Sequence, residues 1–227
     1  MSDIKKLVIF GDSVMQGILW SGEKERYFRR EHAFEPLREQ GIDICNFARM
    51  GATVEQGISV MERRLGQVDV KDTLVLLEYG GNDCDHNWKE VSDAPDAEHF
   101  PHVLPEIFED TYRKAVEMVR KCGARVAMAS IIPLDAEKYM KWISRNLNYH
   151  AILHWLGDVS MLFRWQEYYS RLVENLAKEL SCPLIDLRSS FLLTHRYEDC
   201  FCVDGIHPSA LGYSMLDRSL AKAVQSI

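Results

Sequence analysis

The sequence predicts an α/β protein in which a parallel sheet carries helices on both faces. Short apolar runs alternate along the chain with longer segments whose apolar residues recur at helical spacing. One short run, 73–79, is apolar at nearly every position, which is typical of a strand buried on both faces. Strand and helix in regular alternation imply parallel strands with helical crossovers.

Five strands are expected, and each has a local reason. They span 6–10, 42–47, 73–79, 124–132 and 183–186. The first is a short apolar run that ends at Gly11, and the second follows Gly41, which acts as a helix stop. The fourth is an apolar run that ends before Pro133, and the fifth is a short run that begins at Pro183. These strands would form the central sheet.

Five helices are expected between and after the strands. They span 24–40, 53–65, 104–122, 163–180 and 209–225. The first is charged and helical in rhythm, and the second has Thr53 near its start. The third shows a continuous apolar side and ends at Gly123, while the last two are amphipathic. Alternation with the strands places these helices on the two faces of the sheet.

Length and charge narrow the class of protein. With 227 residues the chain suits a single domain over 1–227 with one buried core. Its net charge of −7 argues against nucleic acid or an anionic membrane as partner. No run approaches the roughly 18 apolar residues of a membrane span. The apolar run at 7–10 is also shorter than the about 7–15 residues of a secretory signal. A cytoplasmic protein is therefore expected.

The cysteines indicate neither a disulfide framework nor a metal centre. There are six, at 45, 84, 122, 182, 200 and 202, and none forms a Cys-x-x-Cys pair. A chain of this size does not need disulfides, and a cytoplasmic location keeps thiols reduced. We expect no metal and no cofactor.

In parallel α/β sheets, ligand sites form beyond the carboxyl ends of the strands. Four polar or glycine-rich segments of the sequence are candidates for such a site. They are Gly11-Asp12-Ser13-Val14, Asn46 to Thr53 with Gly51, Gly80-Gly81-Asn82-Asp83, and Asp204-Gly205-Ile206-His207. Three directly follow an expected strand, and the fourth precedes the closing helix. We therefore expect their side chains to meet at one edge of the sheet.

The residue types in these segments fit acyl transfer from an ester. Ser13 can act as nucleophile if His207 takes its proton, because histidine changes charge near neutral pH. Asp204, three residues before His207, can hold the imidazole in the required tautomer. The backbone N–H groups of Ser13 and Gly51 and the amide of Asn82 are candidate oxyanion donors. The expected partner is a small-molecule ester.

The four segments together resemble the motif blocks of the SGNH (GDSL-type) hydrolase family. Gly11-Asp12-Ser13-Val14 is similar to the GDSL block with valine for leucine, and Gly51 to the glycine block. Asn82 falls in a GxND pattern and His207 in a DxxH pattern. The resemblance implies a flavodoxin-like three-layer α/β/α sandwich with a mostly parallel five-stranded sheet. It also implies metal-free hydrolysis of carboxylic esters or thioesters.

Several neighbours of the motifs carry secondary expectations. Asp12 is expected to hydrogen-bond the surrounding loops, and His86 is a candidate pocket residue. Cys84 and Cys202 flank the predicted site. They are either thiols whose oxidation inhibits the enzyme or, the interpretation we prefer, buried and inert.

The segment 134–165 is expected to be a helical insertion after the fourth strand. It is rich in aromatic and aliphatic residues, including Trp142 and Trp155. Such an insertion fits either a wall of the substrate pocket or the contact surface of a homo-oligomer.

Four functions remain open on the sequence. They are an esterase for small acyl groups such as a carbohydrate deacetylase, a lipase- or thioesterase-like enzyme for longer chains, an acyltransferase, and a catalytically silent binding module. The intact set Ser13, Asn82, Asp204 and His207 argues against the last.

Overall fold

A five-stranded, fully parallel sheet forms the centre of the molecule. The structure is a computed structural model that describes residues 4–227. The strand order is β4 (Asp43–Asn46), β1 (Lys6–Gly11), β5 (Thr73–Glu78), β6 (Arg125–Ala129) and β7 (Leu184–Ile185). All neighbours run parallel, and Leu7 of β1 pairs with Ile44 and Leu74 on its two sides. The predicted parallel sheet is confirmed.

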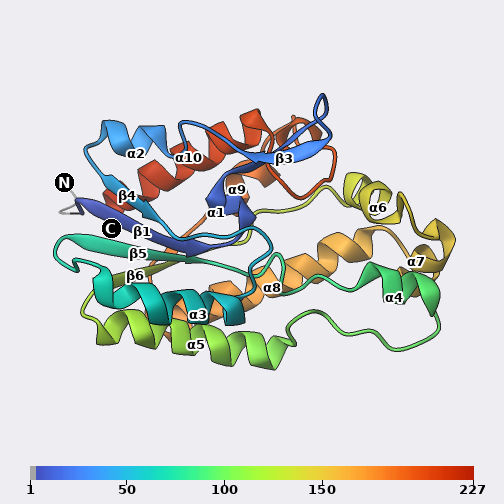
Figure 1. Cartoon of the computed structure of the whole chain (residues 1–227), viewed down its shortest axis with the longest axis horizontal. Coiled ribbons are helices and arrows are strands. Elements are labelled where there is room, and N and C mark those ends of the chain that lie inside the picture. Colours follow the sequence, from blue (N-terminus) through green and yellow to red (C-terminus); the bar gives the residue numbers. More distant parts are fainter. Residues whose placement is uncertain (1–3) are drawn as a thin grey trace.

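Helices cover both faces of this sheet, so the molecule has three layers (Figure 1). One face carries α3 (Val54–Arg64), α5 (Pro105–Lys121) and α8 (Ser160–Glu179). The other carries α2 (Glu35–Glu39), α9 (Arg188–Leu192) and α10 (Ala210–Ser226). Short 3-10 turns lie at Leu65–Gln67 and Glu198–Cys200. The α/β/α sandwich expected from the sequence is therefore confirmed.

Two apolar cores separate the layers because side chains alternate along each buried strand. Leu7 and Ile9 of β1 pack toward α10, whereas Val8 and Phe10 pack toward α3 and α5. All four are fully buried. This two-sided burial holds the carboxyl end of β1 rigidly where the site begins.

Three helices lie beyond the carboxyl ends of the strands: α4 (Trp88–Asp93), α6 (Ala136–Ser144) and α7 (Tyr149–Leu156) (Figure 1). Each begins at a side-chain cap, provided by Asn87, Asp135 and Asn148 respectively. Together with the start of α8 they enclose a third apolar cluster around Tyr139 and Ile152. Helices thus occupy much of 134–165, and they lie beyond the carboxyl ends of the strands.

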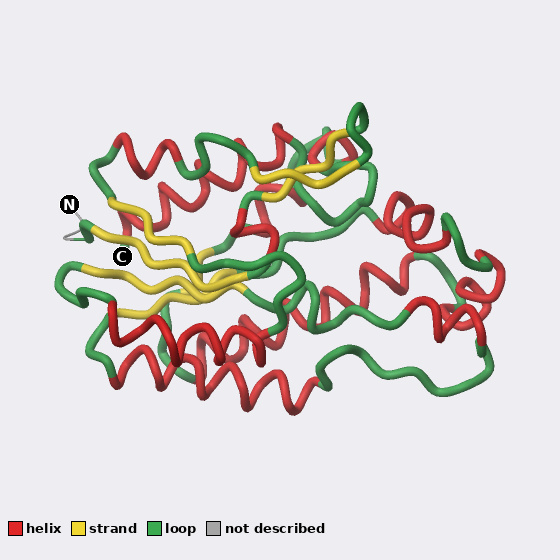
Figure 2. Tube along the Cα trace, viewed as in Figure 1, coloured by secondary structure: helices red, strands yellow, loops and turns green. Residues whose placement is uncertain are grey.

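The prediction of a helix over residues 24–40 is wrong. This part of the chain instead holds the second strand of a hairpin, β2 (Ile18–Ser21) and β3 (Arg26–Arg29), followed by the short α2. The hairpin stands apart from the central sheet (Figure 2). β-Branched and aromatic residues favour the paired strands, and Trp20 faces Tyr27 across them with ring centroids 4.9 Å apart. The pairing of the two strands therefore decides the local structure, although the charged residues recur at helical spacing.

None of the helices within residues 4–227 combines the length and hydrophobicity that crossing a lipid bilayer requires.

Candidate active site

The turn after β1 places Ser13 at the first position of the short helix α1 (Ser13–Gln16). Asp12 caps this helix, because its Oδ1 accepts a hydrogen bond from the Val14 N–H at 2.8 Å. Gly17 ends the helix at φ 81°, in the left-handed region. Ser13 is buried in this sharp turn and its hydroxyl faces the interior of the site.

Ser13, His207 and Asp204 form a continuous hydrogen-bonded chain. The Ser13 Oγ lies 2.9 Å from His207 Nε2, and His207 Nδ1 lies 2.7 Å from Asp204 Oδ2. All three side chains are buried. The structure therefore brings together the three residues that the sequence placed at separate ends of the chain. The geometry is suited to transfer of the serine proton to the imidazole.

The local turn fixes the relation between Asp204 and His207. Asp204 Oδ1 accepts hydrogen bonds from the Ile206 N–H at 3.1 Å and the His207 N–H at 3.0 Å. Burial by itself raises the pKa of Asp204, but the hydrogen bond and charge of His207 and these backbone donors outweigh it, so the net pKa is lowered. Asp204 is therefore an ionised partner for the imidazole at neutral pH.

The three candidate oxyanion donors are in different situations. The Ser13 N–H occupies the first helical position, where a helix N–H has no partner within the helix. Asn82 lines the cavity, but its Nδ2 donates to Asp12 Oδ2 at 3.0 Å and to the Ala52 carbonyl at 3.2 Å. Gly51 is exposed, has φ 74°, and is not among the residues that line the cavity.

Three buried carboxyl groups lie beneath the site. Burial raises the pKa of Asp12 to about 6 and that of Asp83 to about 7. Burial, followed by the nearby charge of Asp12, raises the pKa of Glu78 well above its ordinary value. The raised pKa values mean that Asp12 and Glu78 bind protons more readily than exposed carboxyl groups do. Asp12 accepts hydrogen bonds from the Val14 N–H and from the Asn82 amide, so it joins the surrounding loops as the sequence predicted.

A cavity of about 370 Å³ opens from Ser13 and His207, and its walls are mainly apolar. The segment 134–165 contributes much of this wall through Leu134, Tyr139, Trp155, Leu156, Met161, Leu162 and Trp165. Trp142 does not line this cavity and instead packs against Trp20 at 4.9 Å between ring centroids. The pocket-wall interpretation thus fits Trp155 and not Trp142.

His86 also lines the cavity, as the sequence allowed. Burial lowers its pKa to about 4, so its ring is neutral at neutral pH. It packs among indole rings, with Trp155 at 5.0 Å and Trp88 at 5.5 Å between centroids. His86 therefore adds a neutral ring to the aromatic surface at this end of the cavity, where Asp85 and Glu98 also line the wall.

The cysteines near the site are free thiols, as are the other four. Cys84 lines the cavity, and burial raises its pKa well above the ordinary value. Burial also raises the pKa of Cys202, whose Sγ lies 3.4 Å from the Pro208 carbonyl. Both thiols are therefore protonated at neutral pH, which fits the interpretation of inert cysteines. Within residues 4–227, no cluster of three or more His, Cys, Asp or Glu side chains is arranged to hold a metal ion.

Tyr27 is a contact to the site that the sequence does not reveal. Its hydroxyl lies 2.8 Å from Asp204 Oδ2, although the two residues are 177 positions apart. The two adjacent aromatic residues Tyr27 and Phe28 are the one local signal, since aromatic residues favour strands, but they do not indicate which of the two faces inward.

The parallel α/β/α sandwich, with a serine, histidine and aspartate joined beyond its strand ends, has the architecture of an ester hydrolase. The chain belongs to the GDSL-like lipase/acylhydrolase family, whose family model matches residues 9–215. It is accordingly an ester hydrolase of the GDSL type. No curated protein sequence matches the chain.

Solved structures show the same fold at low sequence identity. The lipase/acylhydrolase from Enterococcus faecalis is 15% identical, with 98% of this chain and 96% of that chain covered and a TM-score of 0.63. A lipolytic G-D-S-L family protein from Veillonella parvula is 13% identical over 98% and 99% of the two chains, with a TM-score of 0.67. The acetylxylan esterase from Geobacillus stearothermophilus is 20% identical over 99% and 96%, with a TM-score of 0.66.

Proposed function

We propose that the protein hydrolyses carboxylic esters through an acyl-enzyme on Ser13, with His207 as general base and Asp204 as its orienting carboxylate. The observation that carries this proposal is the pair of contacts at 2.9 and 2.7 Å that link the three side chains. In the first step His207 Nε2 takes the hydroxyl proton while Ser13 Oγ bonds to the ester carbonyl carbon. The same proton then passes to the departing alcohol as its C–O bond breaks.

In the second half-reaction, water replaces the alcohol. His207 takes a proton from water, the hydroxide oxygen bonds to the acyl carbon, and Ser13 Oγ leaves with the proton held on the imidazolium. Asp204 stabilises that imidazolium in both halves because it is ionised and fully buried beside Nδ1. The products are a carboxylic acid and an alcohol.

The negative charge of each tetrahedral intermediate requires hydrogen-bond donors. The Ser13 N–H is the first, because its helical position leaves it free for a substrate oxygen. The Asn82 amide is the second if it exchanges its longer contact, at 3.2 Å to the Ala52 carbonyl, for the oxyanion. The contact with Asp12 then keeps the amide aimed at the site. Gly51 is the proposed third donor on its motif position alone, since in the structure it is exposed and does not line the cavity.

The acyl group of the substrate is proposed to be an apolar chain. The cavity next to Ser13 is lined mainly by aliphatic and aromatic side chains. Polar residues such as Asp85 and Glu98 are a minority of its lining, and the His86 ring is neutral. An acetyl group would leave most of the 370 Å³ unfilled. Each further methylene buried there contributes about 0.8 kcal/mol, or roughly fourfold in kcat/KM, until the cavity is filled.

The test combines covalent labelling with turnover. A fluorophosphonate probe should label Ser13, and p-nitrophenyl esters from acetate to decanoate should show kcat/KM rising with chain length to a maximum. Ser13→Ala and His207→Ala should each remove most turnover, and the double variant should be little worse because the two act as a unit. Ser214→Ala, which changes an exposed serine on α10, is the matched control and should retain activity.

The same experiment separates the alternatives. An active Ser13→Ala variant, or labelling at another residue, would overturn the mechanism. Maximal activity on acetylated xylan or other acetyl esters would instead favour a deacetylase, and preference for acyl thioesters a thioesterase. Ester product formed from an added alcohol in place of the free acid would identify an acyltransferase that uses the same acyl-enzyme.

A further inference from the structure

The β2–β3 hairpin delivers one side chain to the triad. Tyr27 Oη donates a hydrogen bond to Asp204 Oδ2 at 2.8 Å, and this is the oxygen that His207 Nδ1 contacts at 2.7 Å. The Tyr27 ring also lies against the imidazole, with centroids 4.9 Å apart. We propose that Tyr27 is a positioning residue that fixes Asp204 and His207 for proton transfer. The proposal rests on the proposed function of these two residues.

Tyr27 completes the set of donors around the buried carboxylate. Oδ1 of Asp204 accepts two backbone N–H groups from its own turn, and Oδ2 accepts His207 and Tyr27. Asp204 is fully buried, so water cannot replace a lost donor without entering the site. Burial and the charge of Asp204 raise the pKa of Tyr27 far above its ordinary value. The Tyr27 hydroxyl is thus protonated at neutral pH and acts as a donor.

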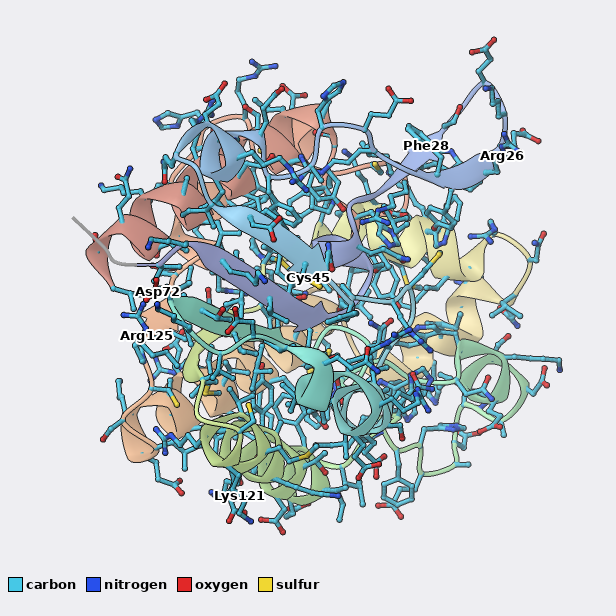
Figure 3. All side chains as sticks on the ribbon, turned by 60° about the vertical axis from the view of Figure 1, so that its left-hand side comes forward. Arg26, Phe28, Cys45, Asp72, Lys121 and Arg125 are labelled. Carbon is cyan, nitrogen blue, oxygen red and sulfur yellow. The ribbon has the colours of Figure 1, made fainter. Side chains whose placement is uncertain are left out.

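The alternation of β3 directs Tyr27 inward. Its neighbours Arg26 and Phe28 are exposed, and they lie on the outer part of the hairpin in Figure 3. Tyr27 points to the opposite face, where Trp20 contacts it from β2 and Trp142 from α6, at 4.9 and 6.2 Å between ring centroids. Aromatic contacts from two separate elements therefore limit the rotation of the Tyr27 ring.

The base of the hairpin is fixed to α10. Arg30, directly after β3, makes two hydrogen bonds with Asp217 at 2.6 and 2.7 Å, and both side chains are largely buried. Its guanidinium also lies 4.2 Å from the ring centroid of Tyr213, whose hydroxyl donates to the Ile18 carbonyl at 2.8 Å. Because both strands are held, Tyr27 is placed before any substrate binds.

The test removes only the hydroxyl. In Tyr27→Phe we expect kcat to fall about tenfold, because a hydrogen bond to a buried carboxylate is lost. KM and the chain-length preference should be unchanged, since Tyr27 does not line the cavity. The low-field proton resonance of the His207–Asp204 hydrogen bond in the phosphonylated enzyme should shift. The control Tyr169→Phe loses a buried hydrogen bond to the Val103 carbonyl away from the triad and should leave that resonance in place.

The outcomes distinguish this proposal from the function on which it rests. If the wild-type enzyme is labelled at Ser13 while Tyr27→Phe keeps its kcat, Tyr27 has no positioning role and the mechanism stands. Loss of kcat to the same extent in both variants with an unmoved resonance also overturns the proposal, because the effect is then general destabilisation. If the wild type is not labelled at Ser13, the proposed function and the role of Tyr27 fail together.

Discussion

Asp12 Oδ2 lies 3.0 Å from Asn82 Nδ2, and this hydrogen bond joins the loop after β1 to the loop after β5. The other oxygen of Asp12 caps α1 through the Val14 N–H. One carboxyl group therefore orients both the turn that carries Ser13 and the amide that we propose as an oxyanion donor. Because Asp12 is buried, the arrangement is shielded from solvent.

Substitution Asp12→Asn is expected to lower kcat by about a hundredfold with little change in KM. The new amide turns a donor toward the Asn82 amide, which then rotates away from the oxyanion position, and one such donor is typically worth about 10²–10³ in kcat. Steady-state kinetics checks this. Asp186→Asn, which changes an exposed aspartate that accepts the Ser189 N–H, is the control. Equal activities of the two variants would contradict an orienting role for Asp12.

The strands and long helices could be predicted because their signals are local. The apolar run of β1 and the glycine after it are adjacent in sequence, and Thr53 forms a capping box with Gln56 within four residues. The meeting of Ser13 and His207 could also be predicted, since carboxyl ends of parallel strands share one edge.

The hairpin could not be predicted in the same way. Its stability depends on the pairing of Trp20 with Tyr27 and on Arg30 contacting Asp217 of α10, which is far away in the sequence. The charged residues around Tyr27 recur at helical spacing, and that local pattern favours a helix. The direction of the Asn82 amide is likewise set by Asp12 and Ala52, which belong to two other loops.

Asp83 is expected to make the protein less stable as pH rises from about 4 to about 7. Its pKa in the folded state, about 7, lies above the unfolded value of 3.8 because it is buried, so the folded state binds the proton more tightly. Ionisation in that window therefore costs folding free energy, with a slope of up to about 1.4 kcal/mol per pH unit.

Urea unfolding at several pH values measures this slope. Asp83→Asn keeps an acceptor for the Val54 N–H and should reduce the slope, while the raised pKa values of Asp12 and Glu78 keep part of it. Asp69→Asn alters an exposed aspartate with a similar backbone contact and should leave it as in the wild type. If Asp83→Asn retains the wild-type slope, the buried proton is carried by another group.

Gly51 can be tested against a glycine with the same backbone conformation. Gly51 and Gly41 have φ of 74° and 78°, and a Cβ at either would meet open space. Alanine at each should therefore destabilise the fold by a similar amount, roughly 1–2 kcal/mol. Only Gly51→Ala should also lower kcat, because strain turns its N–H away from the oxyanion. Parallel denaturation and kinetics decide this, and equal kcat values would remove Gly51 from the proposed oxyanion hole.

Trp155 and Trp142 lie in the same insertion but have different surroundings. Trp155, on α7, lines the cavity that opens from Ser13, whereas Trp142, on α6, lies outside it against Trp20. The sequence alone predicts the same role for both tryptophans, because both belong to one aromatic-rich segment. Substituting each in turn therefore tests whether the pocket wall determines the acyl-chain preference, with Trp142 as the control.

Trp155→Ala is expected to shift the preferred p-nitrophenyl ester to a longer acyl chain, because removing the indole lengthens the apolar cavity. It should also lower kcat/KM for the acyl group that fills the wild-type cavity, since that group loses apolar contact. Trp142→Ala should leave the ratio of kcat/KM between octanoate and butanoate esters unchanged. The measurement is kcat/KM across the ester series, with sedimentation velocity on each variant. An unchanged profile for Trp155→Ala together with a changed oligomeric state would instead assign the segment to a contact between subunits.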